Sequence, residues 1–430
     1  MKRDGWATTS QRARPETSST QSSSPLFLRR LESVRGLAAL CVAICHTMSY
    51  LLITNTELPL FEQPSVRDAA ISLISGFIDG ETAVIVFFAI SGVVIGRSLD
   101  ARRSDFASFM VRRVFRLYPA HVVATLGIVA LGAVFLIDAR PIDFASYPHF
   151  SELHAATLNG EIFNPLRIKS VGGTMLMATW SLNVVVWSLY AEVCAAPFLP
   201  VFHKLSRKRT GWVDLATLAA LLGLFVFNWD HLWSRYLFVF YFGMLVETRG
   251  IAIAAAIERV LGGTWGALGF FYLLLVFPNT LVGTRPPWVV AVEAVAAFGI
   301  VAVIVRSEGR PVLASLESPV LRWNGRLSYS FYLWHYIILV IAVRALYARF
   351  SPEVMQQYEL LFFFSTLLIT VAIALGVAQL SYRFVEVPFI RLGRAVLESG
   401  QRLLERRTKA RSASGQSADA TDMRNVLHGD

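Results

Sequence analysis

Long apolar runs are the feature that most constrains this chain. A helix needs about 20 apolar residues to cross the hydrocarbon core of a bilayer. With 55% hydrophobic and 16% charged residues, the 430-residue chain also lacks the polar surface that a water-soluble protein of this size needs. The sequence therefore predicts an all-α, polytopic membrane protein of about ten transmembrane helices. The ten candidate spans are Ser33–Ile53, Ala83–Leu99, Pro119–Ile137, Val184–His203, Trp212–Phe227, Trp233–Glu247, Gly262–Phe277, Trp288–Val305, Leu327–Leu346 and Leu360–Phe384.

The basic residues are distributed unevenly between the connections, and this predicts an orientation. Lysine and arginine residues near membrane spans collect on the cytoplasmic side. In this chain they fall in every other connection, at Arg12, Arg14, Arg29, Arg30, Arg102, Arg103, Arg112, Arg113, Lys204, Arg207, Lys208, Arg209, Arg306, Arg310, Arg322 and Arg326, and again over Arg391–Arg407. We therefore expect both termini to be cytoplasmic and the protein to lie in the inner (plasma) membrane, surrounded by its lipid.

Polar sequence flanks the apolar region at both ends. Residues 1–30 are rich in Ser, Thr, Gln and Arg, and the last part of the chain is rich in Ser, Ala and Asp. Such segments bury too little apolar surface to pack. The sequence predicts a disordered cytoplasmic tail over 1–30, one membrane domain over 31–391 and a polar cytoplasmic tail over 392–430.

Composition excludes several other classes of protein. The formal net charge of +10 would suit a nucleic-acid partner, but the basic residues lie between apolar runs, as membrane topology requires. We therefore expect no nucleic acid. The three cysteines, Cys41, Cys45 and Cys194, lie inside apolar runs, which leaves no disulfide framework and no cysteine-based zinc site. We expect no metal.

Arg35 and His46 are the ionisable residues of interest in the first apolar run. Eleven residues separate them, close to three helical turns, so both lie on one helix face about 16 Å apart. With Arg35 at the cytoplasmic interface, His46 lies near the bilayer midplane. A lone intramembrane histidine is as often a buried group satisfied by a neighbouring helix as a functional one. The arginine on the same face favours function.

A cluster of arginines follows the second apolar run. Arg112, Arg113 and Arg116 lie close together, and guanidinium groups bind phosphate well. Membrane topology alone also predicts cytoplasmic arginines, so the spacing leaves both interpretations open. Within the second run, Ser91 and Gly92 interrupt bulky residues and allow close approach by a neighbouring helix or a ligand.

Glu192 is the ionisable carboxylate of the fourth run, and Ser188 lies one turn earlier on the same face. A carboxylate inside the membrane is costly and needs a partner, so we expect an arginine or a histidine beside it. Such a residue indicates a functional site.

The last two runs add further polar residues. Ser328, Tyr332 and His335 follow at i, i+4 and i+7 and form one polar stripe on an apolar helix. The stripe must face protein or water. Arg383 and Glu386 close the tenth run, and we expect them to form an interfacial ion pair.

In order and spacing these segments resemble the acyltransferase 3 family of membrane acyltransferases, which includes O-antigen, exopolysaccharide and nodulation-factor acetyltransferases. The resemblance extends from about Leu31 to Arg391. It rests on Arg35 and His46 as an Arg-x10-His pair and on the segments "FFAISGVVI", "RRVFRLYP", "WSLYAE", "LSYSFYLWH" and "SYRFVEVP". Relatives often carry a second acid where this chain has Val193, which argues against a two-carboxylate mechanism.

The resemblance implies transfer of an acyl group, most often acetyl, from cytoplasmic acyl-CoA to a hydroxyl of a cell-surface glycan or lipid-linked saccharide. His46 would be the general base, because an imidazole with an ordinary pKa of about 6.5 accepts a proton near neutral pH. Glu192 would be the second catalytic residue and would orient that imidazole or stabilise the imidazolium. The expected donor-binding residues are Arg35, Arg112, Arg113, Arg116, Ser91 and Gly92. The expected acceptor-binding residues are Trp187, Ser188, Tyr332 and His335.

A proton-coupled secondary transporter of a small solute is the alternative from a different class, because buried His, Glu and Arg can form a proton relay. No motif repeats between the two halves of the chain, which argues against it. A scaffold without chemistry fits poorly with so many intramembrane ionisable groups. The acceptor is not evident: Tyr147, His149, His154 and Trp180 in a long connection suit either the rim of a sugar site or a membrane-interface anchor.

Overall fold

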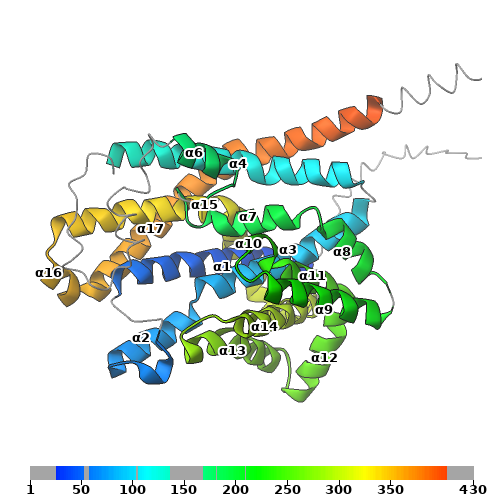
Figure 1. Cartoon of the computed structure of the whole chain (residues 1–430), viewed down its shortest axis with the longest axis horizontal. Helices are drawn as coiled ribbons and strands as arrows, with labels where there is room; N and C mark the ends of the chain where they lie inside the picture. Colours follow the sequence, from blue (N-terminus) through cyan, green and yellow to red (C-terminus); the bar gives the residue numbers. More distant parts are fainter. Residues whose placement is uncertain are drawn as a thin grey trace, which may run out of the picture.

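A computed structural model describes residues 26–52, 58–102, 105–135, 168–180, 182–208 and 210–403. The described part of the chain is helical and contains no strand (Figure 1). Its α-helices are α1 (Leu26–Leu51), α2 (Val66–Phe77), α3 (Gly80–Arg102), α4 (Phe106–Phe135), α6 (Ile168–Met175), α7 (Val186–Ala195), α8 (Leu199–Ser206), α9 (Gly211–Phe227), α10 (Leu232–Arg235), α11 (Leu237–Leu245), α12 (Ile251–Val260), α13 (Thr264–Val282), α14 (Pro287–Arg306), α15 (Pro319–Arg349), α16 (Pro352–Gln357) and α17 (Glu359–Ser381). Short 3₁₀ or π turns are η1 (Leu60–Glu62), η3 (Val246–Gly250), η4 (Pro311–Glu317) and η5 (Tyr382–Glu386).

The prediction of an all-α polytopic membrane protein is confirmed, with a change in the number of spans. In the described residues, 8 helical segments are long and apolar enough to cross a membrane: α1, α2–α3, α4, α10–α12, α13, α14, α15, and α17 with its continuation. The apolar helix α9 is shorter. The expected span Val184–His203 consists instead of α7 and α8, which meet at Pro197. Proline lacks an N–H and its ring clashes with the preceding turn, and here the helix breaks at this residue.

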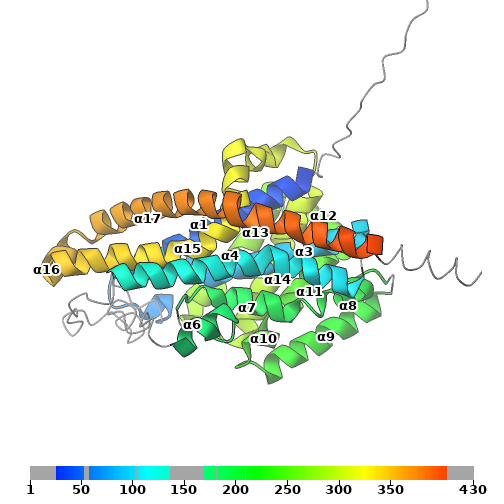
Figure 2. The same ribbon diagram turned by 90° about the horizontal axis from the view of Figure 1, so that it is seen from above.

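Helices α1 and α15 lie side by side at the centre of the bundle, and α17 packs against both (Figures 1 and 2). Two glycines allow the close approach: a Cβ on Gly36 would lie 2.7 Å from the backbone nitrogen of Gly325. Farther along, His46 is level with His335, and Tyr50 with Tyr336. The two helices therefore run parallel, and residues at the same height along α1 and α15 can be matched.

The first turn of α1 is anchored to the connection between α14 and α15. Arg30 is 2% exposed; it donates to the Ser307 hydroxyl and the Arg310 carbonyl, both at 2.8 Å, and pairs with Glu317 at 2.6 Å. These bonds satisfy a buried charge. The helix accordingly begins at Leu26, so the last residues of the predicted tail 1–30 are helical.

The C-terminal boundary also differs from the prediction. The helix that contains α17 continues to Leu403, so residues 392–403 are helical rather than part of a polar tail. Residues 1–25 and 404–430, the remainder of the two predicted tails, lie outside the described residues. The start of α1 and this last helical turn lie at the same end of the bundle (Figures 1 and 2). We call it the arginine-rich end, defined by Arg97, Arg207 and Arg310.

The opposite end of the bundle is held by Arg285, in the connection between α13 and α14. Its guanidinium contacts Asp79 at 2.6 Å, Glu81 at 2.8 Å and Glu293 at 3.2 Å. Tyr236 donates to the second oxygen of Glu81 at 2.5 Å. One cation thus joins α3, α11 and α14 and offsets three carboxylates, of which Glu293 is fully buried.

Candidate active site

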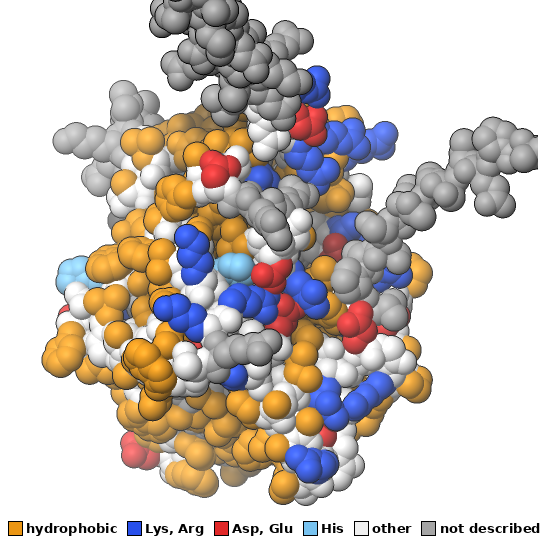
Figure 3. Space-filling model, turned by 90° about the vertical axis from the view of Figure 1, so that its right-hand side faces the viewer, with side chains coloured by type: hydrophobic (Ala, Val, Ile, Leu, Met, Phe, Trp, Pro, Cys, Tyr) orange, Lys and Arg blue, Asp and Glu red, His pale blue; other side chains and the backbone are white. Residues whose placement is uncertain are grey.

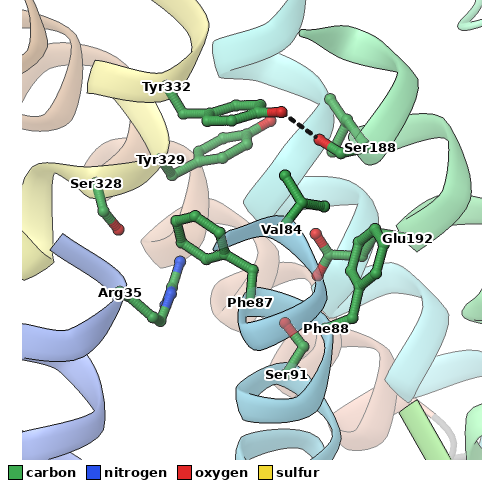
Figure 4. Close-up of a pocket in the computed structure, with 11 residues that line it drawn as sticks. Arg35, Val84, Phe87, Phe88, Ser91, Ser188, Glu192, Ser328, Tyr329 and Tyr332 are labelled. Carbon is green, nitrogen blue, oxygen red and sulfur yellow. Dashed lines mark hydrogen bonds between the residues drawn. The ribbon is translucent and has the colours of Figure 1, made fainter. Parts of the chain in front are cut away.

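A pocket lies between α1, α3, α7 and α15 (Figure 4). Arg35, Ser91, Ser188, Glu192 and Tyr332 contribute to its wall. The sequence singled out these five residues in four separate segments, and the fold brings them together. The other lining residues are Val84, Phe87, Phe88, Leu189, Ser328 and Tyr329.

Arg35 projects into this pocket (Figure 4). Its buried Nε has no hydrogen-bond partner, and no ion pair joins its guanidinium to a residue in the described part of the chain. Glu192, Glu386 and Glu32 attract it from beyond contact distance. A charge held in a low-dielectric interior needs a partner, so the pocket suits a ligand that brings negative charge or hydrogen-bond acceptors to Arg35.

Glu192 has an arginine partner, as its place in an apolar run predicts. Its Oε1 accepts from Arg113 Nη2 at 2.6 Å, and the two side chains are only 22% and 11% exposed. The expected role of Glu192 toward His46 stays a prediction, and the contact that the structure gives Glu192 is with Arg113. Glu192 shares a pocket wall with Arg35, whereas His46 is three helical turns farther along α1.

The arginines of the "RRVFRLYP" segment have different surroundings. Arg113 is neutralised by Glu192. Arg112 is half-buried in the same turn. Arg116 is exposed and makes no hydrogen bond with a described residue, and it attracts Glu386 and Glu32 from a distance. Arg116 is therefore the member of the cluster best placed to bind an incoming anion.

His46 lies one layer of side chains beyond the pocket wall. Its ring centroid is 5.6 Å from that of His335 and 5.3 Å from that of Tyr336. The His335 ring is in turn 5.8 Å from the ring of Tyr332, whose hydroxyl accepts from Ser188 at 2.8 Å. The stripe on α15 therefore connects the pocket to His46.

His335 is fully buried, and its contacts identify its tautomer. Its Nδ1 lies 3.0 Å from the carbonyl oxygen of Tyr332 and 3.3 Å from that of Phe331. Carbonyl oxygens only accept, so Nδ1 carries the hydrogen. Nε2 is then an acceptor, and within the described chain it has no partner. A substrate hydroxyl would suit it.

His46 lies far from the arginine-rich end of the bundle. Arg35 is the tenth residue of the 26-residue helix α1, and His46 is the twenty-first. Because α1 begins at Leu26, Arg35 falls in the middle third of the helix and His46 in the last third. His46 is half-buried. A substrate can therefore approach it from the end opposite the arginines.

Gly92 and Trp187, like the histidines and the arginines of α4, lie outside the pocket wall. Gly92 is at the crossing of α3 and α11, where a Cβ would lie 2.8 Å from the Cα of Gly243. It allows the close packing of these two helices, the first of the two roles that the sequence allowed. Trp187 packs against Tyr236, with ring centroids 5.6 Å apart. The next residue along the chain, Ser188, lines the pocket, whereas Trp187 does not.

Of the four residues that could form the rim of a sugar site, Trp180 is the one in the described part of the chain. Trp180 is partly exposed and packs against Tyr190 with ring centroids 6.0 Å apart. Tyr147, His149 and His154 lie outside the described residues.

The expected pair between Arg383 and Glu386 does not form. Glu386 is buried and accepts from the hydroxyl of Ser330, whereas Arg383 lies over the ring of Phe384 at 5.7 Å. The cause is the π turn η5, whose extra residue changes the helix phase. Glu386 therefore faces the interior, near Arg35 and Arg116.

Sequence reasoning also missed the surroundings of Glu32. Arg326, Arg322, Arg35 and Arg116 all attract this carboxylate. Arg322 and Arg326 belong to α15, and the parallel packing of α15 on α1 brings them here. Four arginines from three helices thus lie near one acid, at the side of the pocket that faces the arginine-rich end.

The surface of the arginine-rich end is charged at its centre and apolar around it (Figure 3). Arg207 pairs with Asp100 and with Glu247 at 3.0 Å, and His203 lies 2.8 Å from Asp100. Arg97 also pairs with Glu247. These charges offset one another and join α3, α8 and η3.

The apolar helices, the pocket with its unpaired arginine, and the histidine beyond Tyr332 fit a membrane-embedded acyltransferase. The chain belongs to the acyltransferase 3 family: the family's acyltransferase domain matches residues 28–379.

Curated relatives agree with this assignment. The acyltransferase MdmB of Streptomyces mycarofaciens is 25% identical over 401 residues, which is 84% of this chain and 92% of that protein. A Staphylococcus aureus (strain COL) protein, named provisionally as an O-acetyltransferase, is 25% identical over 359 residues, and the match spans 75% of this chain and 54% of that protein. A protein of Acidianus two-tailed virus, named provisionally as an acetyltransferase, is 25% identical over 72% of this chain and 82% of its own length. No solved structure matches the chain.

Proposed function

We propose that this enzyme transfers an acyl group, acetyl in the simplest case, from acyl-CoA to a hydroxyl of a cell-surface glycan or lipid-linked saccharide. The observation that carries the proposal is the position of Arg35 in the pocket wall with His46 farther along the same helix. Arg35 faces the pocket without a counter-ion, and His46 lies one layer beyond Tyr332. The names of the relatives support acetyl, and the glycan acceptor follows from the resemblance of the motifs.

The reaction needs one proton acceptor beside the acyl carbon. The acceptor hydroxyl gives its proton to His46 while its oxygen attacks the thioester carbonyl carbon. The carbon–sulfur bond then breaks, the His46 imidazolium gives its proton to the leaving sulfur, and an ester, free CoA thiol and the neutral imidazole result. Removal of the hydroxyl proton is the step that makes the oxygen a competent nucleophile. The His335 Nε2 accepts a hydrogen bond beside His46 and holds the acceptor sugar in place.

The charged head of the donor stays at the arginine-rich end, because phosphates cannot enter hydrocarbon. Arg116, exposed and without a hydrogen-bonded partner in the described residues, binds these phosphates, with Arg112 in support. Glu192 acts through Arg113: it fixes this guanidinium at the mouth of the pocket. The test of the whole proposal is transfer of labelled acetyl from acetyl-CoA by the purified protein in liposomes that contain a lipid-linked saccharide.

We expect Arg116→Ala and Arg113→Ala to have different kinetic effects. Loss of Arg116 removes a phosphate ligand, so KM for acetyl-CoA should rise roughly tenfold with little change in kcat. Loss of Arg113 leaves Glu192 without its cation, so kcat and protein yield should fall together. Steady-state kinetics with varied acetyl-CoA separates the two. Arg349→Ala, at the far end of α15, is the control, and an unchanged donor KM in Arg116→Ala would contradict phosphate binding by this residue.

We also expect acyl-CoA to be consumed from the arginine-rich end alone, which we place in the cytoplasm. Labelled acetyl-CoA should be used when added to sealed inside-out vesicles, and should not be used when added outside right-side-out vesicles. Detergent-opened vesicles of both kinds are the control and should behave alike. Efficient use by sealed right-side-out vesicles would reverse the proposed orientation.

A further inference from the structure

The last helix of the described chain is longer than a membrane span requires. Helix α17 alone has 23 residues, and about 20 are enough to cross the hydrocarbon core. Residues 387–403, which we call the C-terminal extension, continue the helix past that core at the arginine-rich end. They cross α4, where a Cβ on Gly393 would lie 2.7 Å from the Cβ of Phe115, and then diverge from the bundle (Figure 1). The extension therefore lies beyond the part of the helix that the membrane span explains.

One flank of the C-terminal extension is apolar and uncovered. At 3.6 residues per turn, four large apolar side chains lie within about 60° of one another, to one side of the face that Gly393 turns to α4. They are Phe389, Leu392, Val396 and Leu403, which are 38%, 49%, 46% and 59% exposed. A contiguous apolar strip on a helix outside the hydrocarbon core marks a contact with a membrane or another apolar surface.

The flank on the other side of the Gly393 face is basic. Arg391, Arg394 and Arg402 are exposed and lie within about 80° of one another. Arg402 is 3.5 Å from Glu398, and both side chains are more than 60% exposed, where such a pair is weak. The sequence of 404–411 adds four basic residues and one acidic residue. The extension thus has an excess of positive charge opposite its apolar flank.

A helix with one apolar and one basic flank, joined directly to a membrane span, fits the surface of a bilayer that contains anionic lipid. We propose that the C-terminal extension contacts the leaflet at the arginine-rich end. Its apolar flank enters the boundary between headgroups and acyl chains, and its arginines bind the phosphates of anionic phospholipid. Membrane topology alone accounts for the arginines, but it does not account for the apolar flank. This lipid contact goes beyond the proposed acyl transfer and does not depend on it.

A polarity-sensitive dye on the apolar flank tests the contact in the full-length protein. The dye is attached at Val396→Cys after Cys41, Cys45 and Cys194 are replaced by alanine, and the protein is reconstituted in phosphatidylcholine vesicles with increasing amounts of phosphatidylglycerol. Dye emission should increase and shift to the blue as phosphatidylglycerol is added. Each of Arg391→Gln and Arg394→Gln should raise the amount needed for half of the change about fivefold. The triple variant that also carries Arg402→Gln should show no change.

Two matched variants control for effects other than lipid contact. Gln401→Cys places the dye on the basic flank, where the emission should change much less. Arg259→Gln removes an exposed arginine of α12 at the same end of the bundle, and it should leave the lipid response of the dye at Val396→Cys unaltered. Equal emission with and without phosphatidylglycerol would overturn the proposal, and so would an unaltered response in the triple variant. A full response to soluble polyphosphate with phosphatidylcholine vesicles would overturn it too, because the site would then take a free anion.

A second measurement uses the protein with its native cysteines. Phosphatidylglycerol and phosphatidylcholine are added in equal amounts in a neutral detergent, and the lipids that remain bound are counted by native mass spectrometry. The wild-type protein should retain more phosphatidylglycerol than the triple variant, with no difference in phosphatidylcholine. Equal retention of phosphatidylglycerol by the two proteins would contradict binding of anionic lipid by these arginines.

Discussion

Replacement of His46 by alanine is expected to lower the rate of acyl transfer by about 10²–10⁴-fold, the usual effect of removing a general base. The neighbouring imidazole of His335 is fully buried and has the binding role proposed above, and we assign it no part in the proton transfer. His46 is half-buried and has room for a smaller side chain, so the protein should still fold. The measurement is single-turnover transfer of labelled acetyl in liposomes.

A histidine elsewhere in the membrane domain provides the control for this variant. His121 on α4 is buried, contacts the carbonyl of Thr174 at 2.8 Å and does not line the pocket. His121→Ala should cost stability through that lost bond, and the folded fraction should transfer at a normal rate. Near-normal turnover by His46→Ala would remove the general-base assignment.

Loss of Arg285 is expected to have the largest effect on stability. Its removal leaves Asp79, Glu81 and the fully buried Glu293 facing one another without a cation. Breaking a buried ion pair by removing one partner costs about 3–5 kcal/mol. Arg285→Ala should therefore give little folded protein, which size-exclusion chromatography and thermal unfolding in detergent will show.

A second substitution tests whether charge repulsion causes the loss of stability in Arg285→Ala. Arg285→Ala combined with Glu293→Gln removes the most buried negative charge and should recover part of the stability. Arg67→Ala is the control, because Arg67 pairs with Glu359 at the surface and is 46% exposed, where such pairs contribute little. If the double variant were no more stable than Arg285→Ala, charge repulsion would not be the cause.

The sequence located much of the site because polar residues inside apolar runs are costly and rarely accidental. Arg35, Ser188, Glu192 and Tyr332 were identifiable in this way, and all four line the pocket. The partner of Glu192 was not identifiable, because it depends on which helices pack together. Arg113 was assigned to phosphate, and in the structure it is bound to that carboxylate.

Other differences between the predicted and the observed structure have local causes. Pro197 was present in the expected fourth span and marks the break between α7 and α8, a signal that hydropathy alone overlooks. The π turn that moves Glu386 inward leaves no pattern in the sequence. Ser328 belongs to a stripe that the sequence shows, but whether its hydroxyl has a partner depends on how α15 packs.

The pairing of α1 with α15 also affects how the protein is made. Among the candidate spans, α1 has the lowest mean hydropathy, and an arginine near the centre of a span raises the free energy of insertion by about 2.5 kcal/mol. The residues that cover its polar face come much later in the chain: Tyr50 bonds to Tyr336, 286 positions away. Ribosomes make chains from the N-terminus, so α1 enters the bilayer long before α15 exists. During synthesis Arg35 and His46 must therefore be shielded by the insertion machinery or by other early helices, and no shortened chain that lacks α15 can assemble the site.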